Sequence, residues 1–129
     1  MKFDIEGKDG IPAPTPAQIS RAIKSLRSYG PSSYASLTDD AGNYVQVAGG
    51  GISCLIEHFK IDGERRARAF HDKPSPARPD GTILVCRAGD IPMRSDEWFM
   101  SDQVAKVFLS FLSGNPFPPF VHWRPTPGF

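Results

Sequence analysis

The chain lacks most of the features that would give it a covalent frame, a membrane anchor or an export signal. Its 129 residues include only two cysteines, Cys54 and Cys86, too few for a disulfide framework in a chain that can build a hydrophobic core. Both lie in apolar runs, which favours buried free thiols. No stretch approaches the ~18 apolar residues of a membrane span, and the N-terminus has no apolar signal-peptide core. We therefore expect a cytoplasmic protein without a membrane partner.

Excess charge of one sign is also missing. The chain has 15 Lys and Arg residues against 14 Asp and Glu residues, so it has no overall field to recruit nucleic acid or an anionic membrane. The one basic run is Arg65, Arg66 and Arg68, and only Phe70 lies near it as a platform for stacking bases. We predict no direct binding of nucleic acid and interpret this run as the solvated face of a strand.

Known catalytic and metal-binding motifs are absent as well. The glycines at 49–51 are followed by a strand-like segment rather than a helix, so we expect a bulge or turn there and not a phosphate site. Cys54 and His58 would lie ~13 Å apart along one strand, too far to share a metal ion. The acidic pairs Asp39-Asp40 and Asp96-Glu97 fall at predicted turns, where solvation is expected. We predict no catalytic residue, no cofactor and no metal.

Two segments have the pattern of amphipathic helices. Thr15, Pro16 and Gln18 form a capping box with proline at the first helical position, and Gly30 marks the expected end of this helix. A second helix is expected to begin with Ser101 and Asp102 as its cap, and to end at Gly114. The apolar stripes that support these helices are Ile19, Ala22, Ile23 and Leu26 in the first, and Val104, Val107, Phe108, Phe111 and Leu112 in the second.

Between the helices the apolar pattern changes to that of strands. Alternation predicts strands over 34–38, 43–47, 52–59 and 64–71, followed by short strands at 82–86, 97–100 and 121–123. The fold class is therefore α+β, an antiparallel β-sheet meander with two amphipathic helices packed on it. We expect one domain over 1–129, with an irregular N-terminal lead-in at 7–14, a proline-containing surface loop at 73–81 and a proline-rich tail at 115–129.

Three stretches resemble the first-listed Imm family of immunity proteins from bacterial polymorphic-toxin systems. They are the turn and strand that run into paired glycines over 40–50, the Ile91-Pro92 turn, and a C-terminal pattern. That last pattern is a helix with Val104, Phe108 and Phe111, then Gly114, a proline and Val121-His122-Trp123. The likeness covers about residues 34–124, and the loop at 73–79 and the tail at 125–129 look like additions to it.

The resemblance implies an antitoxin used in interbacterial competition. Such a protein binds the cognate toxin domain of a secreted protein and inhibits it by contact rather than by turnover; the toxins of this family often belong to the nucleic-acid deaminase class. The free protein is expected to be a monomer. Two alternatives stay open, an adaptor or secretion chaperone that binds its partner without inhibiting it, and a small enzyme with a dispersed active site.

The residues also indicate where a toxin would be held. The turns at 39–43 and 60–64 bring Asp39, Asp40, Asp62 and Glu64 to loop tips. Toxins that act on nucleic acid need positive surfaces, and carboxylates at loop tips can meet such a surface and speed association. With the aromatic residues Tyr44 and Trp98, which we expect to be exposed, these acids form the predicted toxin-binding surface.

Overall fold

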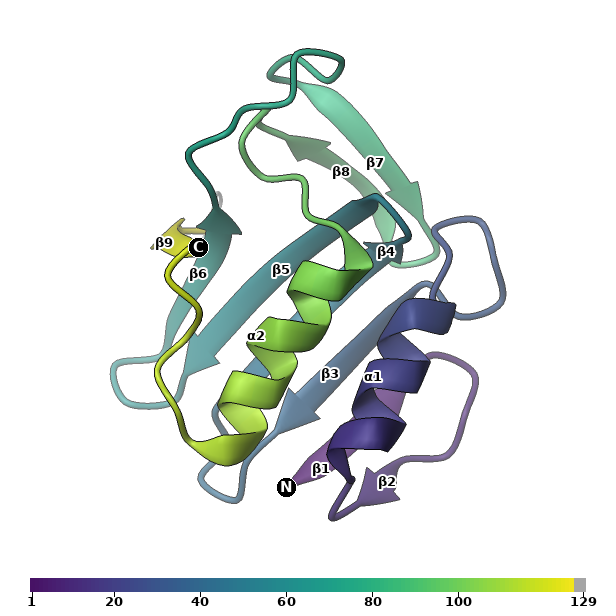
Figure 1. The fold of residues 1–129 in the computed structure, drawn as a ribbon, viewed down its shortest axis with the longest axis vertical. Helices are drawn as coiled ribbons and strands as arrows, with labels where there is room; N and C mark the ends of the chain where they lie inside the picture. The colour runs from purple at the N-terminus through teal and green to yellow at the C-terminus, as the bar shows by residue number, and fades with distance from the viewer. Residues whose placement is uncertain (127–129) are drawn as a thin grey trace.

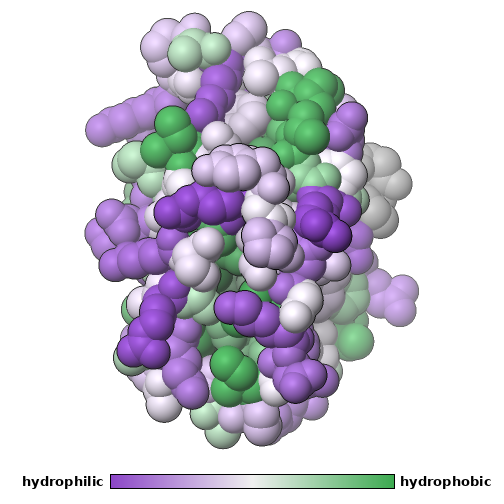
Figure 2. All heavy atoms as spheres, turned by 90° about the vertical axis from the view of Figure 1, so that its right-hand side faces the viewer, coloured by the Kyte–Doolittle hydropathy of each residue, from purple (hydrophilic) through white to green (hydrophobic). Residues whose placement is uncertain are grey.

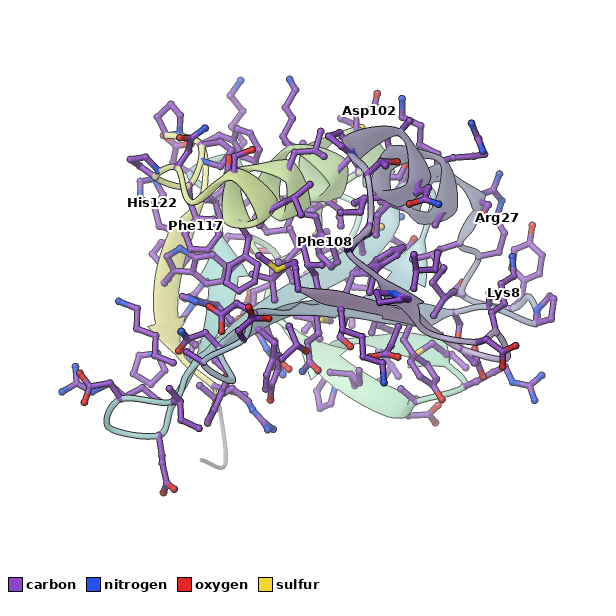
Figure 3. All side chains as sticks on the ribbon, turned by 90° about the horizontal axis from the view of Figure 1, so that it is seen from below. Lys8, Arg27, Asp102, Phe108, Phe117 and His122 are labelled. Carbon is purple, nitrogen blue, oxygen red and sulfur yellow. The ribbon has the colours of Figure 1, made fainter. Side chains whose placement is uncertain are left out.

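The structure, a computed structural model that describes residues 1–126, has three layers: two helices, a large antiparallel sheet, and a β-hairpin on the far side of that sheet (Figures 1 and 3). The elements in chain order are β1 (Lys2–Ile5), β2 (Ile11–Pro12), α1 (Pro16–Ser25), β3 (Tyr34–Thr38), β4 (Tyr44–Gly50), β5 (Ser53–Lys60), β6 (Arg65–Phe70), β7 (Thr82–Cys86), β8 (Gly89–Met93), α2 (Ser101–Ser113) and β9 (His122–Pro125).

The large sheet has seven strands in the order β2-β1-β3-β4-β5-β6-β9, and every pairing in it is antiparallel. Its centre, β3 to β6, is the meander of four consecutive strands that the alternation predicted. Strands β7 and β8 form a separate two-stranded sheet. The predicted α+β class, with helices packed on an antiparallel meander, is confirmed.

The main hydrophobic core lies between the helices and the sheet. Phe108 of α2 is fully buried and meets the ring of Phe3 edge-on at 6.3 Å between centroids. Figure 3 shows Phe108 pointing from α2 toward the sheet. Ile19 and Ile23 of α1 are buried beside it. Side chains of this size each contribute roughly 1.5–3 kcal/mol on burial, so this layer holds much of the stability of the fold.

A second, smaller core lies on the opposite face of the sheet, under the hairpin. Leu55 of β5 packs there with Leu84 of β7 and Met93 of β8, and with Trp98 from the segment that leads into α2. Because residues alternate along a strand, the outward partners of Leu84 are Ile83 and Val85, which are exposed. The inner side of the hairpin therefore packs on the sheet, and its outer side faces the surroundings.

The helix ends agree with the capping prediction at α1 and differ at α2. Thr15 caps α1 and exchanges hydrogen bonds with Gln18, as predicted, but the helix ends at Ser25 rather than running to Gly30. The N-cap of α2 is Met100, not Ser101, and the Gln103 side chain accepts the Met100 backbone N–H at 2.9 Å. Its C-cap is confirmed, since Gly114 adopts the left-handed conformation with φ 70°.

The turn predicted at the glycines 49–51 is present but begins only at Gly51, because β4 continues through Gly50. A side chain at Gly50 would lie 2.1 Å from the Leu26 carbonyl oxygen, so glycine is required where the end of α1 crosses the strand. The turn itself is made by Gly51 and Ile52.

Five strand assignments differ from those that the sequence predicted. Strands β1 and β8 were not predicted, and the lead-in at 7–14 contains the short strand β2. The segment 97–100 makes only one isolated bridge, from Phe99 to Cys54. The last strand lies at His122–Pro125, so Arg124 and Pro125 of the predicted tail pair with β6. The remainder of that tail, at 127–129, lies outside the described residues.

Candidate functional site

The face of the sheet opposite the helices contains a cleft with a volume of about 610 Å³. Ligand sites in proteins commonly have volumes of roughly 300–1,000 Å³, so this cleft is large enough to receive a small molecule or part of a partner. Strands β1, β3, β4, β5 and β6 form its floor, Ala88 and Ile91 of the hairpin form one wall, and Thr126 lies at the β6 end. The lining comprises Asp4, Ile5, Glu6, Gly7, Tyr34, Ala35, Ser36, Gln46, Val47, Ala48, Leu55, Glu57, Arg66, Arg68, Ala88, Ile91 and Thr126.

A row of polar side chains crosses the floor of the cleft in register. Asp4 of β1 is paired with Ser36 of β3, Ser36 with Gln46 of β4, Gln46 with Glu57 of β5, and Glu57 with Arg68 of β6. Directly paired residues point to the same face of a sheet, so the five side chains share the cleft side. Neighbouring strands lie ~4.8 Å apart, which makes the row ~19 Å long.

Arg68 is held at the centre of an ionic network. It is only 7% exposed, and its Nε lies 3.4 Å from Oε2 of Glu57. Its Nη1 donates to the Pro92 carbonyl at 3.3 Å and lies 3.5 Å from Oε1 of Glu97. Glu57 is fixed from its other side, because Gln46 donates to its Oε1 at 2.8 Å. Buried charges need partners of this kind, so the network fixes the floor of the cleft.

Glu97 and Asp96 extend this network to strand β9. Glu97 is 1% exposed and accepts the Arg94 backbone N–H at 2.7 Å, while Arg124 bonds to Asp96 and lies 3.6 Å from Oε2 of Glu97. The prediction that the Asp96-Glu97 pair is solvated is wrong, and so is the interpretation of Arg68 as a solvated residue. The loop from β8 to α2 folds against the sheet and buries these groups.

Hydrogen-bond donors gather at the β6 end of the cleft. Arg66 and Arg68 project from the same side of β6, and the Thr126 backbone N–H bonds to the Arg66 carbonyl at 3.2 Å. Arg66 also donates to the Tyr44 hydroxyl at 2.8 Å. Thr126 is 2% exposed, and its hydroxyl has no hydrogen-bond partner among residues 1–126. A buried hydroxyl without a partner is uncommon in proteins.

The β1 end of the cleft has a different electrostatic character. Glu6 accepts hydrogen bonds from the Ser33 backbone and hydroxyl and forms an ion pair with Arg87 at 2.9 Å. Burial acts to raise the pKa of Glu6, but the bonds from Ser33 and the Arg87 cation bring it below its ordinary value. Asp4 lies 3.7 Å from Lys2, and both side chains are about half exposed. Acidic groups at this end are thus paired locally.

The structure brings the two predicted acidic turns together. The Asn43 side chain accepts the Ile61 backbone N–H at 2.9 Å, so the turns at 39–43 and 61–64 are in contact. Asp62 and Glu64 are exposed there. Asp40 pairs with the N-terminal amine at 2.8 Å.

Asp39 has a structural role within its turn. Its carboxylate accepts hydrogen bonds from the Ala41 and Asn43 backbone and from the Asn43 side chain. Slight burial acts to raise the pKa of Asp39, but these hydrogen bonds lower it overall. The carboxylate is therefore engaged with its own turn.

The two aromatic residues of the predicted surface differ in exposure. Tyr44 is half-buried and stacks on Phe59 with 5.0 Å between ring centroids. Trp98 is 7% exposed, so the expectation that it is an exposed anchor is wrong. It packs in the core under the hairpin, with the Arg78 guanidinium 4.4 Å above its ring. The segment before α2 passes beneath the hairpin, which carries Trp98 inward.

Of the remaining chemical candidates, Cys54 and His58 lie on the helix side of the sheet, and Cys86 lies in β7 of the hairpin. Cys54 and Cys86 are free and buried, and burial raises the pKa of Cys54 to about 12, so its thiol stays protonated at neutral pH. His58 is packed among the rings of Phe111, Phe117 and Trp123. Within residues 1–126 there is no group of three or more His, Cys, Asp or Glu side chains arranged to hold a metal ion.

Comparisons with known proteins found no similar protein. No protein-family model matches the chain, and neither the curated proteins nor the solved structures include a significant match. In the part of the chain that the structure describes, no helix is long and apolar enough to cross a membrane.

Sequence reasoning missed the cleft and its ionic network. The available signal was the alternation in β6, where Arg66 and Arg68 fall on one side and Ala67 and Ala69 on the other. Small apolar residues between arginines indicate that one side of the strand faces the core. The partner Glu57 could be recognised only as an acidic residue that directly follows the apolar run 54–56 in its strand.

Proposed function

We propose that this chain is an immunity protein that binds a cognate toxin domain in the cytoplasm of the producing cell, and that the cleft is its main contact surface. The observation that carries the proposal is the cleft itself, whose floor spans five strands and displays Ser36, Gln46, Glu57 and Arg68 in one row. A concave surface with fixed polar groups and apolar walls is suited to receiving a protruding part of another protein.

The rigidity of the floor supports a role in tight binding. Glu57 and Arg68 are held by hydrogen bonds to Gln46 and Pro92 before any partner arrives. Preorganised side chains lose little conformational entropy when a complex forms, which raises affinity for a given contact area. An antitoxin needs such affinity, because it must hold its toxin while the producing cell makes it.

The test is protection and binding. A toxin-like domain taken from a neighbouring gene is expressed in a host with and without the chain, and the complex is measured by titration calorimetry. We expect restored growth and one-to-one binding with a Kd of about 1 nM or lower, equivalent to about −12 kcal/mol.

The other outcomes identify the alternatives. Tight binding that leaves the toxin active would indicate an adaptor or secretion chaperone. Turnover of a substrate by the chain alone, lost on replacing Glu57 by Gln, would indicate a small enzyme. Binding in the micromolar range, or no binding, would contradict the antitoxin proposal.

A further inference from the structure

We propose that the β6 end of the cleft is a carboxylate-binding subsite, and that the partner inserts an Asp or Glu side chain there. This inference rests on the proposed function for the identity of the partner, but the subsite can be tested alone. The donors concerned are the Arg68 guanidinium and the Thr126 hydroxyl, which both line the cleft.

The first argument is that Arg68 retains unused donor capacity. Its Nε is taken by Glu57, and its Nη1 by Pro92 and Glu97. Its Nη2 makes no hydrogen bond to any residue in 1–126. A guanidinium has five N–H donors, so two remain for a ligand in the cleft. The side chain is buried and held from two directions, which fixes where those donors point.

Thr126 supplies an independent argument. Its hydroxyl is buried without a hydrogen-bond partner among the described residues, although it lines the cleft. Leaving a buried hydroxyl unbonded costs about 1–3 kcal/mol, a cost that a ligand oxygen in the cleft would remove. Thr126 lies beside Arg66, because its backbone N–H bonds to the Arg66 carbonyl.

Geometry places these donors within reach of one ligand group. Thr126 lies opposite Arg66 on the neighbouring strand, so it is a diagonal neighbour of Arg68, roughly 7–8 Å away. The ligand must therefore accept hydrogen bonds from both Arg68 and Thr126, and guanidinium pairs with carboxylate strongly and in a fixed geometry.

The same surroundings favour a carboxylate over a phosphate. Glu57 lies 3.4 Å from Arg68, and Glu97 lies 3.5 Å from it on the other side. These two negative charges balance much of the positive charge at this end. A singly charged carboxylate meets less repulsion from them than a phosphate that carries up to two charges.

The experiment is an NMR titration of the ¹⁵N-labelled full chain with N-acetyl-glutamate N-methylamide. The neutral isostere N-acetyl-glutamine N-methylamide and inorganic phosphate serve as comparison ligands. We expect amide shifts confined to residues 65–69, 124 and 126, with millimolar affinity for the glutamate probe and at least about five-fold weaker binding of the glutamine probe. Equal binding of both amides, stronger binding of phosphate, or no shift at these residues would overturn the proposal.

Two matched variants sharpen the titration. Thr126→Val removes the hydroxyl but keeps the branched shape, and because that hydroxyl has no partner among residues 1–126, the variant is expected to fold. Thr38→Val makes the same change on the same sheet face, outside the cleft lining. We expect Thr126→Val to weaken the glutamate probe several-fold and Thr38→Val to leave its affinity unchanged; equal affinities in the two variants would contradict the subsite.

The two proposals fail in different ways. If the glutamate probe does not bind but the toxin domain is still neutralised, the subsite is wrong and the antitoxin role stands. If the probe binds at the subsite and no toxin is neutralised, the subsite stands and the antitoxin role is wrong.

Discussion

The two faces of the seven-stranded sheet come from the same strands but carry different side chains. One is lined by large apolar residues, and the other carries a row of polar and charged residues. The face under the helices is filled by Phe3, Leu37, Val45 and Ile56, which are all essentially fully buried. The other face carries Ser36, Gln46, Glu57 and Arg68 in a cross-strand row and is covered by the hairpin over only part of its width. Stability is concentrated on the first face, and the capacity to bind is concentrated on the second.

This division follows from strand alternation. In β4, Val45 and Val47 belong to the core under the helices, and Tyr44 and Gln46 point to the opposite face, where Gln46 lines the cleft. A substitution at one position therefore affects one face, and its neighbour affects the other. The faces can be perturbed separately, and the following predictions use that separation.

The largest effect is expected on the helix face. Phe108→Ala removes a fully buried ring that contacts Phe3, and we expect it to lower the free energy of unfolding by about 3–5 kcal/mol in urea denaturation. Ile83→Ala, an exposed position on the outer side of the hairpin, is the control and should change that free energy by less than about 0.5 kcal/mol. Equal losses in the two variants would mean that the helix face is not the main source of stability.

A smaller loss is expected on the cleft face, from the ionic network. Arg68→Met leaves the buried carboxylates Glu57 and Glu97 without their shared cation, and we expect a loss of about 3 kcal/mol. Adding Glu97→Met removes one of these stranded charges, so the double variant should be more stable than the sum of its single variants predicts. Additive losses would show that the three side chains do not act as one network.

The third effect depends on pH and belongs to the helix face. Burial lowers the pKa of His58 below its ordinary value of 6.5, with a smaller contribution from Lys60 against an opposing one from Asp39. The unfolded chain then binds a proton more readily than the folded one. The stability contributed by neutral His58 is thus complete above about pH 6.5 and is lost as pH falls toward the folded pKa.

The check for His58 is unfolding measured between pH 7.5 and pH 5. The wild type should lose stability over this range, and His58→Phe should reduce that loss while leaving the titration of other groups in place. An identical pH dependence in both proteins would show that His58 does not titrate differently on folding.

The smallest effect is expected at the acidic turns. Replacing Asp62 and Glu64 by Lys should change the free energy of unfolding by less than about 0.5 kcal/mol, since both side chains are exposed and form no ion pair among residues 1–126. With the cleft as the main contact surface, the rate of association with the toxin should also change little. A large, salt-dependent fall in that rate would indicate that the toxin binds at the acidic turns.

The helix face could be predicted from the sequence because its signals are local. The Thr15-Gln18 capping box and the alternation of Val45 and Val47 each identify an element within a few residues, and the antiparallel meander follows from their order. Gly50 shows the limit of such reasoning, since its role depends on the approach of Leu26 from a distant segment.

The cleft could not be predicted, because it is made by contacts across long sequence distances. Arg68 meets Glu97 29 positions later in the chain, and only the folded loop before α2 brings them together. Trp98 was predicted to be exposed, whereas the segment that contains it runs beneath the hairpin. The surroundings of charged and aromatic residues can be assigned only when the topology of the fold is known.

The most direct test of the central claim places a large side chain in the cleft and compares it with one on the helix layer. Ser36 lines the cleft floor, and Lys106 is exposed on α2, so Ser36→Trp and Lys106→Trp add similar bulk to opposite sides of the molecule. With the toxin domain identified in the protection experiment as ligand, calorimetry should show that Ser36→Trp weakens binding by at least about 30-fold, equivalent to 2 kcal/mol, while Lys106→Trp changes it less than about three-fold. Unchanged binding by a folded Ser36→Trp, or a comparable loss with Lys106→Trp, would contradict the assignment of the cleft as the contact surface.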